Sequence, residues 1–300
     1  MTSNQINVTQ TSTTTNDRKI KSVRQMIRAG VELLAHDIEA GHPEVLAECL
    51  KAMARFHTYS FGNVLLISTQ FPAARQVAGW RGWNDLGRRV KQGEKGIMIF
   101  APILSEPKSV ESQPNGNGKG STEDVRPEQQ LLGFRPVRVF DLAQTEGEEL
   151  AATGHVINAD LADTLKKLMD LATSEQIRIE YSDKIAPAKG TSYRGVIRLL
   201  PDMEAGETVS LLVRELAVQM LYETERRSFV TRDVLLREAK AVAFVVAHAL
   251  GLESESSDSP QLYQGNINLL AESLEVVKRT AAIILGAISP RDEQAQEGSN

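Results

Sequence analysis

Apolar residues recur every three or four positions along much of the chain, which is the spacing of one face of an α-helix. The helices predicted in this way cover residues 20–38, 43–56, 158–173, 207–223, 231–250 and 261–288. Pro43 opens the second of them, and proline is suited to a first helical turn. Residues 59–63 break the pattern, so no helix is expected across them.

Short apolar runs next to turn-forming residues predict strands. Residues 97–104 and 137–141 form two such runs, which we expect to pair with each other. Between them, residues 105–130 carry three prolines and three glycines without an apolar period, which predicts a flexible insertion. Two further strands are predicted over 177–181 and 193–200. Few strands beside many helices indicate an α+β fold.

A length of 300 residues favours two domains. We expect a polar, disordered tail over residues 1–22, an N-terminal helix-plus-small-sheet domain over 23–147, a mostly helical C-terminal domain over 155–289, and a polar tail over 290–300. The chain is 41% hydrophobic and 24% charged, which is typical of a soluble globular protein. No apolar run is long enough for a membrane span, and the N-terminus lacks a secretory signal, so a cytoplasmic protein is expected.

Charge changes the picture between residues 51 and 100. This segment holds eight basic and two acidic residues, a net charge of +6, whereas the whole chain carries −5. A basic island in an acidic protein indicates a polyanionic partner. Aromatic residues lie among the cations, and a single strand of nucleic acid offers phosphates to cations and unpaired bases to aromatic rings. The candidate nucleic-acid contacts are Arg55, Tyr59, Trp80, Arg81, Trp83, Arg88, Arg89, Lys91 and Lys95.

A structural interpretation of the same segment stays open at this point. Both tryptophans can belong to the core, because aromatic side chains supply much of the buried area of a small domain. The basic residues are then a solvated face without a partner. The exposure of Trp80 and Trp83 separates the two interpretations.

The helix predicted over 207–223 resembles half of a zinc motif. In HExxH, two histidines four residues apart bind zinc from one helix face, and the glutamate acts as general base. Here Glu215 is present, but the histidine positions hold Arg214 and Val218. Arginine does not lose its proton to bind a metal, and valine has no donor atom. Glu238, on the next helix, stands where a third ligand is expected.

One glutamate without the two imidazoles does not make a tetrahedral zinc site, so we predict no metal, no cofactor and no catalytic residue here. Glu215 and Glu238 are then vestigial, and we expect Arg214 to form an ion pair with Glu215 or Glu238. The alternative is a rebuilt metal site that uses His248, ten residues beyond Glu238.

From Phe56 to Gly147 the chain resembles the N-terminal domain of ArdC-type antirestriction proteins, described as a single-stranded DNA-binding domain. The matching positions are Tyr59-Ser60, Asn63, Leu65-Leu66-Ile67, Gln70, Trp83, Leu86-Gly87-Arg88, Val90, Lys91-x-Gly93-Glu94-Lys95-Gly96, Phe140-Asp141 and Gln144-Thr145-x-Gly147. From about Tyr193 to Ser289 it looks like the zincin-like metallopeptidase domain that follows in such proteins, without its zinc histidines.

The resemblance implies single-stranded DNA as the partner, an antirestriction or DNA-protection role, and a metallopeptidase fold without a working site. It also leaves room for a second partner, another protein that binds the C-terminal domain. Two other classes of function stay open: a metallopeptidase with a rebuilt metal site, and a protein-interaction or regulatory module that does not bind DNA.

Overall fold

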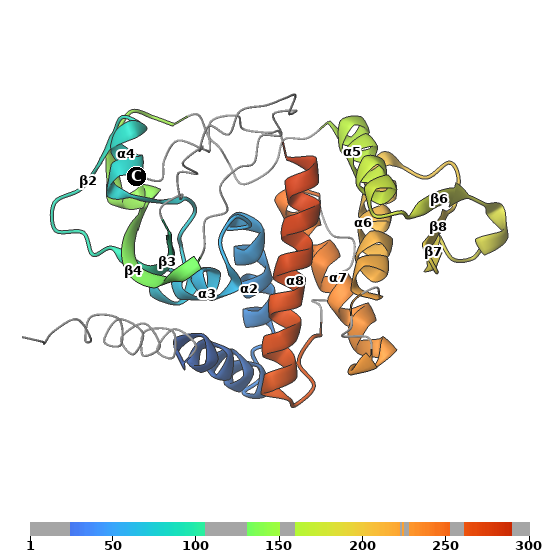
Figure 1. The fold of residues 1–300 in the computed structure, drawn as a ribbon, viewed down its shortest axis with the longest axis horizontal. Helices are drawn as coiled ribbons and strands as arrows, with labels where there is room; N and C mark the ends of the chain where they lie inside the picture. The colour runs from blue at the N-terminus through green and yellow to red at the C-terminus, as the bar shows by residue number, and fades with distance from the viewer. Residues whose placement is uncertain are drawn as a thin grey trace, which may run out of the picture.

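The computed structural model describes residues 25–105, 131–150, 160–222, 224, 228–252 and 261–289, and it has an α+β fold (Figure 1). Besides a helix over 25–39, the helices are α2 (Glu44–Arg55), α3 (Phe61–Gln70), α4 (Trp80–Asp85), α5 (Leu161–Ser174), α6 (Ala205–Tyr222), α7 (Arg232–Ala249), α8 (Ile267–Ile288) and the 3-10 turns η1 (Leu142–Gln144) and η2 (Asp183–Ile185). The strands are β1 (Val77–Gly79), β2 (Arg88–Val90), β3 (Ile97–Leu104), β4 (Leu131–Asp141), β5 (Thr145–Gly147), β6 (Arg178–Tyr181), β7 (Gly190–Tyr193) and β8 (Val196–Leu199).

The expected break over residues 59–63 is wrong in its second half, because α3 already begins at Phe61. The Ser60 side chain accepts a hydrogen bond from the backbone N–H of Asn63 and so starts the helix. Gly62 allows this helix to lie close to the first one, since a Cβ at Gly62 would be only 2.4 Å from Cδ1 of Ile27. The glycine that suggested a break is therefore a packing position.

The two strands predicted around the insertion are confirmed as an antiparallel pair. Ile97 of β3 lies opposite Val139 of β4, and Ile99 lies opposite Val137. On the other side of β4, Gly79 of β1 also lies opposite Val139, which gives the sheet order β1-β4-β3. A separate antiparallel pair, β2 with β5, follows in the same half of the chain.

The prediction of a single strand over residues 193–200 is wrong, because the chain reverses direction within this segment and forms a hairpin. Residues Arg194 and Gly195, with φ of 45° and 73°, form the turn between β7 and β8. Left-handed backbone at both positions is the geometry of a two-residue hairpin turn, which reverses the chain. β6 then pairs in parallel with β8, so the second sheet has the order β6-β8-β7 and β7 is at its edge.

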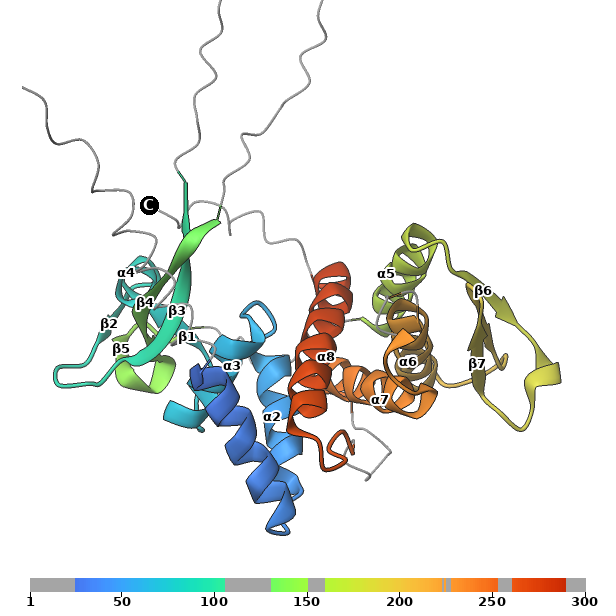
Figure 2. The ribbon, with the colours of Figure 1, turned by 60° about the horizontal axis from the view of Figure 1, so that its bottom comes forward.

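Helices fill the space between the two three-stranded sheets. In Figures 1 and 2, α8 runs through the middle of the molecule, between α2 and α3 on one side and α6 and α7 on the other. α2 packs against α7, and α3 contacts α8. Buried residues of both halves form one hydrophobic cluster, from Val31 to Ile288. Cys49 is buried in it.

Several predictions concern residues outside the described part of the chain. The N-terminal tail, residues 106–130 of the predicted insertion and the tail from residue 290 fall there, and the two domain boundaries stay a prediction. Among the described helices, none is long and apolar enough to cross a membrane.

Candidate functional site

Trp80 offers an exposed aromatic ring. It opens α4 directly after β1, and 58% of the residue is exposed to solvent. Because Gly79 is opposite Val139 in the sheet, Trp80 follows at the level of Arg138, whose side chain is also exposed. Of the three aromatic candidates, Trp80 is the one placed to meet a ligand from solvent.

Trp83 and Tyr59 lie further inside. Trp83 is fully buried, and its indole N–H donates a hydrogen bond of 2.8 Å to the carbonyl of Phe140. No base can stack on a ring in that position. The Tyr59 hydroxyl donates to the carbonyl of Val77 over 3.1 Å, its ring meets Phe56 edge-on, and burial raises its pKa. Both side chains therefore stabilise the fold around β1 and β4.

Arg88 and Arg55 point toward main-chain carbonyls rather than solvent. The Arg88 guanidinium donates to the Thr145 hydroxyl over 2.8 Å, to the Thr145 carbonyl over 3.2 Å, and to the carbonyls of Gly147 and Glu148. These bonds hold β2 against β5. Arg55 donates to the carbonyl of Ala74 over 3.0 Å. Neither guanidinium is an open phosphate contact in this structure.

Four predicted cations remain at the surface: Arg81, Arg89, Lys91 and Lys95. Arg89 lies on β2, and Lys91 and Lys95 lie in the turn that connects β2 to β3. Lys91 Nζ donates to the carbonyl of Ala143 over 2.9 Å but stays exposed. We call Trp80, Arg81, Arg89, Lys91 and Lys95 the basic surface.

Two further exposed cations escaped the sequence argument. Arg135 and Arg138 lie on β4, more than thirty residues beyond the basic island. Arg138 Nη1 donates to the carbonyl of Gly96, 3.3 Å away, which brings it to the base of the β2–β3 turn. Only the β3–β4 pairing joins them to the island. The expected strand began at residue 137 and so left out Arg135, whereas Arg138 lay inside it, and the expected pairing with residues 97–104 was the available signal for Arg138.

Two amide side chains, both at positions of the ArdC-type sequence pattern, form hydrogen bonds to the outer edge of β3. Asn63 pairs with Phe100, its Oδ1 accepting from the backbone N–H over 3.0 Å and its Nδ2 donating to the carbonyl over 2.9 Å. Gln70 makes the same two bonds to Met98, over 3.0 and 2.9 Å. Both come from α3, so the helix satisfies the edge strand. We call these the amide clamps.

Asp141 organises the end of β4. The residue is only 1% exposed, and its carboxylate accepts from the backbone N–H groups of Arg75, Gln76 and Ala143 over 2.7, 3.0 and 2.9 Å. Gln144 returns a bond, since its Oε1 accepts from the N–H of Asp141 over 3.0 Å. This part of the sequence pattern therefore builds the support under the basic surface rather than the surface itself.

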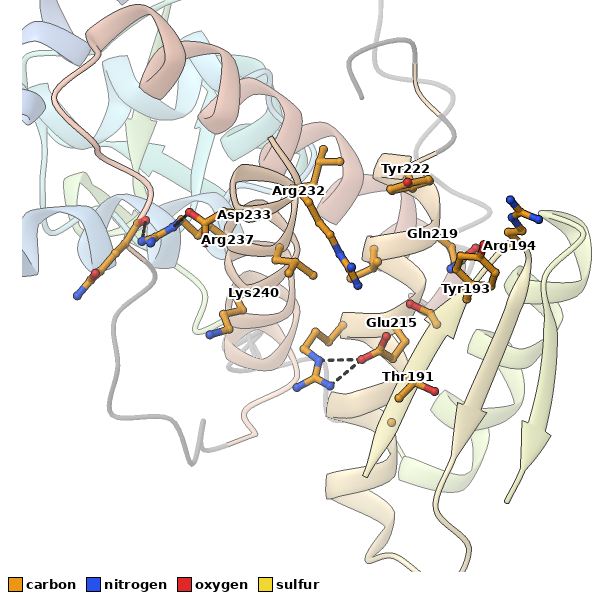
Figure 3. A pocket seen from close by; sticks show the side chains of 17 residues that line it. Thr191, Tyr193, Arg194, Glu215, Gln219, Tyr222, Arg232, Asp233, Arg237 and Lys240 are labelled. Atoms are coloured by element: carbon orange, nitrogen blue, oxygen red, sulfur yellow. Dashed lines mark hydrogen bonds and ion pairs between the residues drawn. The ribbon is translucent and has the colours of Figure 1, made fainter. Parts of the chain in front are cut away.

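In the second half, Arg214 and Glu215 form the ion pair that was expected (Figure 3). Nε and Nη2 of Arg214 lie 3.0 and 2.6 Å from Oε1 of Glu215, which is 5% exposed. Val218, one turn further along α6, presents only carbon atoms. The guanidinium of Arg214 thus neutralises the Glu215 carboxylate.

Glu238 and His248 lie elsewhere. Glu238 is fully buried on α7, and its Oε1 accepts a hydrogen bond from Ser273 of α8 over 2.6 Å. His248 ends α7, where burial and the nearby cations Lys51 and Arg55 of α2 lower its pKa. Within the part of the chain that the structure describes, no three His, Cys, Asp or Glu side chains come together as metal ligands. These residues do not fit a zinc ion.

Comparison with known proteins gives a family match in the first half of the chain. Residues 15–140 match the family model of the N-terminal domain of the anti-restriction factor ArdC. This part of the chain is therefore similar to the N-terminal domain of ArdC. Trp80, the basic surface, the amide clamps and most of β4 lie inside the matched ArdC-type domain, and Asp141 follows directly after it.

A curated relative is a protein of Bacillus anthracis described as uncharacterized, 24% identical over 85% of this chain. The chain spans about half the length of that relative, of which 49% is covered. Two solved structures of the antirestriction ArdC protein from plasmid R388 also match, with a TM-score of 0.49 each. The metal-free form is 16% identical and covers 88% of this chain and 97% of its own; for the Mn(II)-bound form the values are 15%, 89% and 99%.

Proposed function

We propose that this protein binds single-stranded DNA through its basic surface and acts in antirestriction or DNA protection, as befits an ArdC-type domain. The observation that carries the proposal is the exposed ring of Trp80 among exposed cations. Cations attract the backbone of any nucleic acid, but an accessible indole adds stacking energy only where bases are unpaired. A single strand is therefore preferred over a duplex.

Several features support this surface over the full set of sequence candidates. Arg88, Arg55 and Tyr59 are engaged with main-chain atoms, and Trp83 is buried. We leave these four out of the proposed contact surface and add Arg138, which lies at the base of the β2–β3 turn. Because phosphate contacts and stacking carry little base identity, binding is expected to depend weakly on sequence.

The test is fluorescence anisotropy with a labelled oligonucleotide, single-stranded and duplex, at several salt concentrations. The single strand is expected to bind more tightly. Arg89→Gln and Lys95→Gln are each expected to reduce the slope of log affinity against log salt by about 0.7, the value for one phosphate contact on a single strand. Trp80→Ala is expected to cost about 1–3 kcal/mol of binding free energy.

The matched control is Lys166→Gln, which removes one exposed charge from α5 in the other half of the molecule. It should leave both affinity and salt slope unchanged. Equal affinity for duplex and single strand, or a slope that Lys166→Gln lowers as much as Lys95→Gln does, would contradict the proposal. An acidic protein that binds while the oligonucleotides do not would favour an interaction module instead.

We propose further that the second half is a zincin-like module without peptidase activity. The Arg214–Glu215 pair supports this, because a glutamate held by a guanidinium has no metal-bound water to deprotonate. Titration of the purified protein with zinc by calorimetry tests it, with no tight stoichiometric binding expected. Peptide cleavage that depends on added zinc and disappears in Glu215→Gln would show that a metal site has been rebuilt.

A further inference from the structure

A cavity of about 640 Å³ lies between β7, α6 and the first turns of α7 (Figure 3). Thr191 and Tyr193 line it from the edge strand, Arg214 from α6, and Arg232 and Lys240 from α7. This volume is in the range of sites for small organic ligands. The cavity lies in the second half of the chain, where the proposed DNA-binding function assigns no role.

The walls of the cavity carry an excess of positive charge. Five cationic side chains line it, Arg194, Arg214, Arg232, Arg237 and Lys240, against the two carboxylates of Glu215 and Asp233. Both carboxylates already form an ion pair with a cation of the cavity. Glu215 pairs with Arg214, and Asp233 Oδ2 lies 2.7 Å from Arg237 Nε.

Three cations are left over in this cavity: Arg194, Arg232 and Lys240. Within the part of the chain that the structure describes, none of them has a carboxylate partner. The chain as a whole carries −5, so this local excess of three positive charges is a marked departure. A concave site with one sign of charge concentrates ligands of the opposite sign.

The donors suit phosphate. Arginine presents a planar fork of N–H groups that matches two oxygens of one phosphate, and lysine adds a point charge. Arg214 uses Nε and one Nη2 proton on Glu215, which leaves Nη1 for a ligand. Three uncompensated positive charges match a phosphate ester with two or three negative charges better than a single carboxylate.

An aromatic ring stands beside these donors. Tyr193 is 64% exposed, and the guanidinium of Arg194 lies 5.0 Å from its ring centroid. In Figure 3 both side chains are at the β7 end of the cavity. A stacked Tyr–Arg pair is a platform for a planar base. The Ser192 hydroxyl, from the same strand, is buried and has no hydrogen-bond partner among the residues that the structure describes.

We propose that this cavity binds a phosphorylated nucleoside, with the phosphate on Arg214, Arg232 and Lys240 and the base on Tyr193. The ligand is either a free nucleotide or the terminal nucleotide of a DNA strand. The guanidinium at position 214 excludes a metal cation from the cleft and supplies an anion contact in its place. The cleft is therefore an anion site.

Isothermal titration calorimetry of the full chain with adenosine monophosphate tests the proposal, with adenosine as the uncharged comparison. The nucleotide is expected to bind at least tenfold more tightly than the nucleoside. Arg232→Gln and Lys240→Gln are each expected to weaken nucleotide binding about tenfold. Both side chains are exposed and unpaired with carboxylates, so these variants should fold; Arg214→Gln is avoided, because it would leave Glu215 buried without its partner.

Two controls separate this site from the basic surface. Lys166→Gln, on α5, and the double variant Arg89→Gln/Lys95→Gln should both bind adenosine monophosphate as the unchanged protein does. Competition by a hexanucleotide with a 5′-phosphate, but not by the same oligonucleotide without it, assigns the ligand to a strand end; competition by neither assigns it to the free nucleotide.

Three results overturn the proposal. The first is equal affinity for nucleotide and nucleoside. The second is nucleotide binding that Arg232→Gln and Lys240→Gln leave unchanged. The third is a hexapeptide of glutamates that binds more tightly than adenosine monophosphate, which would make the cleft a site for acidic protein segments. Failure of single-stranded DNA binding at the basic surface leaves these measurements unaffected, since they probe different residues.

Discussion

Asp141 shows how a single side chain can hold several segments together. Its carboxylate accepts hydrogen bonds from backbone N–H groups before β1 and in η1, and it lies in the core at 1% exposure. Charged hydrogen bonds are stronger than neutral ones, and the three N–H groups would lose their acceptor without it. The residue therefore fixes the start of β1 relative to the end of β4.

Asp141→Ala is expected to lower the free energy of unfolding by about 3 kcal/mol, because three backbone N–H groups lose a charged acceptor together. Asp85→Ala is the matched control: Asp85 is exposed at the end of α4, and its removal should stay within about 0.5 kcal/mol. Urea unfolding of the three proteins measures both values. Similar losses for the two variants would mean that the Asp141 bonds carry no special weight.

Residue types alone could not assign roles within the basic island. Arg88 and Arg89 are neighbours with the same side chain, yet Arg88 donates to carbonyls of β5 and its surroundings while Arg89 stays exposed. Trp80 and Trp83 separate in the same way, since Trp80 opens α4 at the surface whereas Trp83 is buried and donates to the carbonyl of Phe140. Strand pairing and helix orientation determine which of these side chains is exposed, and neither can be read from the residue types.

At the scale of elements, α3 and β3 are joined by the amide clamps. Each clamp gives one edge residue of β3 both a donor and an acceptor, in the manner of a neighbouring strand. Free strand edges are sites of unwanted pairing, so a helix that occupies this edge also protects it. Asn63 and Gln70 are seven residues apart, two helical turns, which places both on the same side of α3.

Gln70→Ala is expected to speed hydrogen exchange at the amide of Met98, and Asn63→Ala at that of Phe100, because each amide loses its acceptor. Each variant should also cost about 1–3 kcal/mol of unfolding free energy. Thr69→Ala serves as control, since the Thr69 hydroxyl bonds only to carbonyls of its own helix. Exchange rates at Met98 that are equal in Gln70→Ala and Thr69→Ala would rule out the clamp.

Periodicity located most helices to within a few residues, because each has an apolar face that packs on the shared core. The apolar period failed as a guide where a glycine or a turn determines the local structure. Gly62 signals a helix break by propensity but serves helix packing, and Gly195 lies in a turn rather than at the centre of a strand. The cavity in the second half was also missed, since its cations come from the β7–β8 turn, α6 and α7 and meet only in the folded chain.

At the scale of the whole molecule, Lys278 connects the two halves. This α8 residue is 4% exposed, and its Nζ donates to the carbonyl of His57, between α2 and α3, over 2.7 Å. Burial lowers its pKa from the ordinary value of 10.5 to about 8, partly offset by Glu275. A buried ammonium at the junction makes the stability of the molecule depend on pH in a predictable direction.

Between pH 8 and 10.5 the unfolded chain binds more protons at Lys278 than the folded chain, so the free energy of unfolding should rise with pH, by up to about 1.4 kcal/mol per unit. Cys49 acts in the opposite direction, since burial raises its pKa to about 12 and the unfolded thiol ionises first.

Lys278→Met keeps Cys49 and removes only the lysine contribution. In urea unfolding from pH 7.5 to 10, the free energy of unfolding of the unchanged protein minus that of Lys278→Met should therefore rise with pH. The exposed control variant Lys166→Met should have the same pH profile as the unchanged protein. Parallel profiles for the unchanged protein and Lys278→Met would mean that the ammonium keeps an ordinary pKa, and that the junction between the halves is open to water.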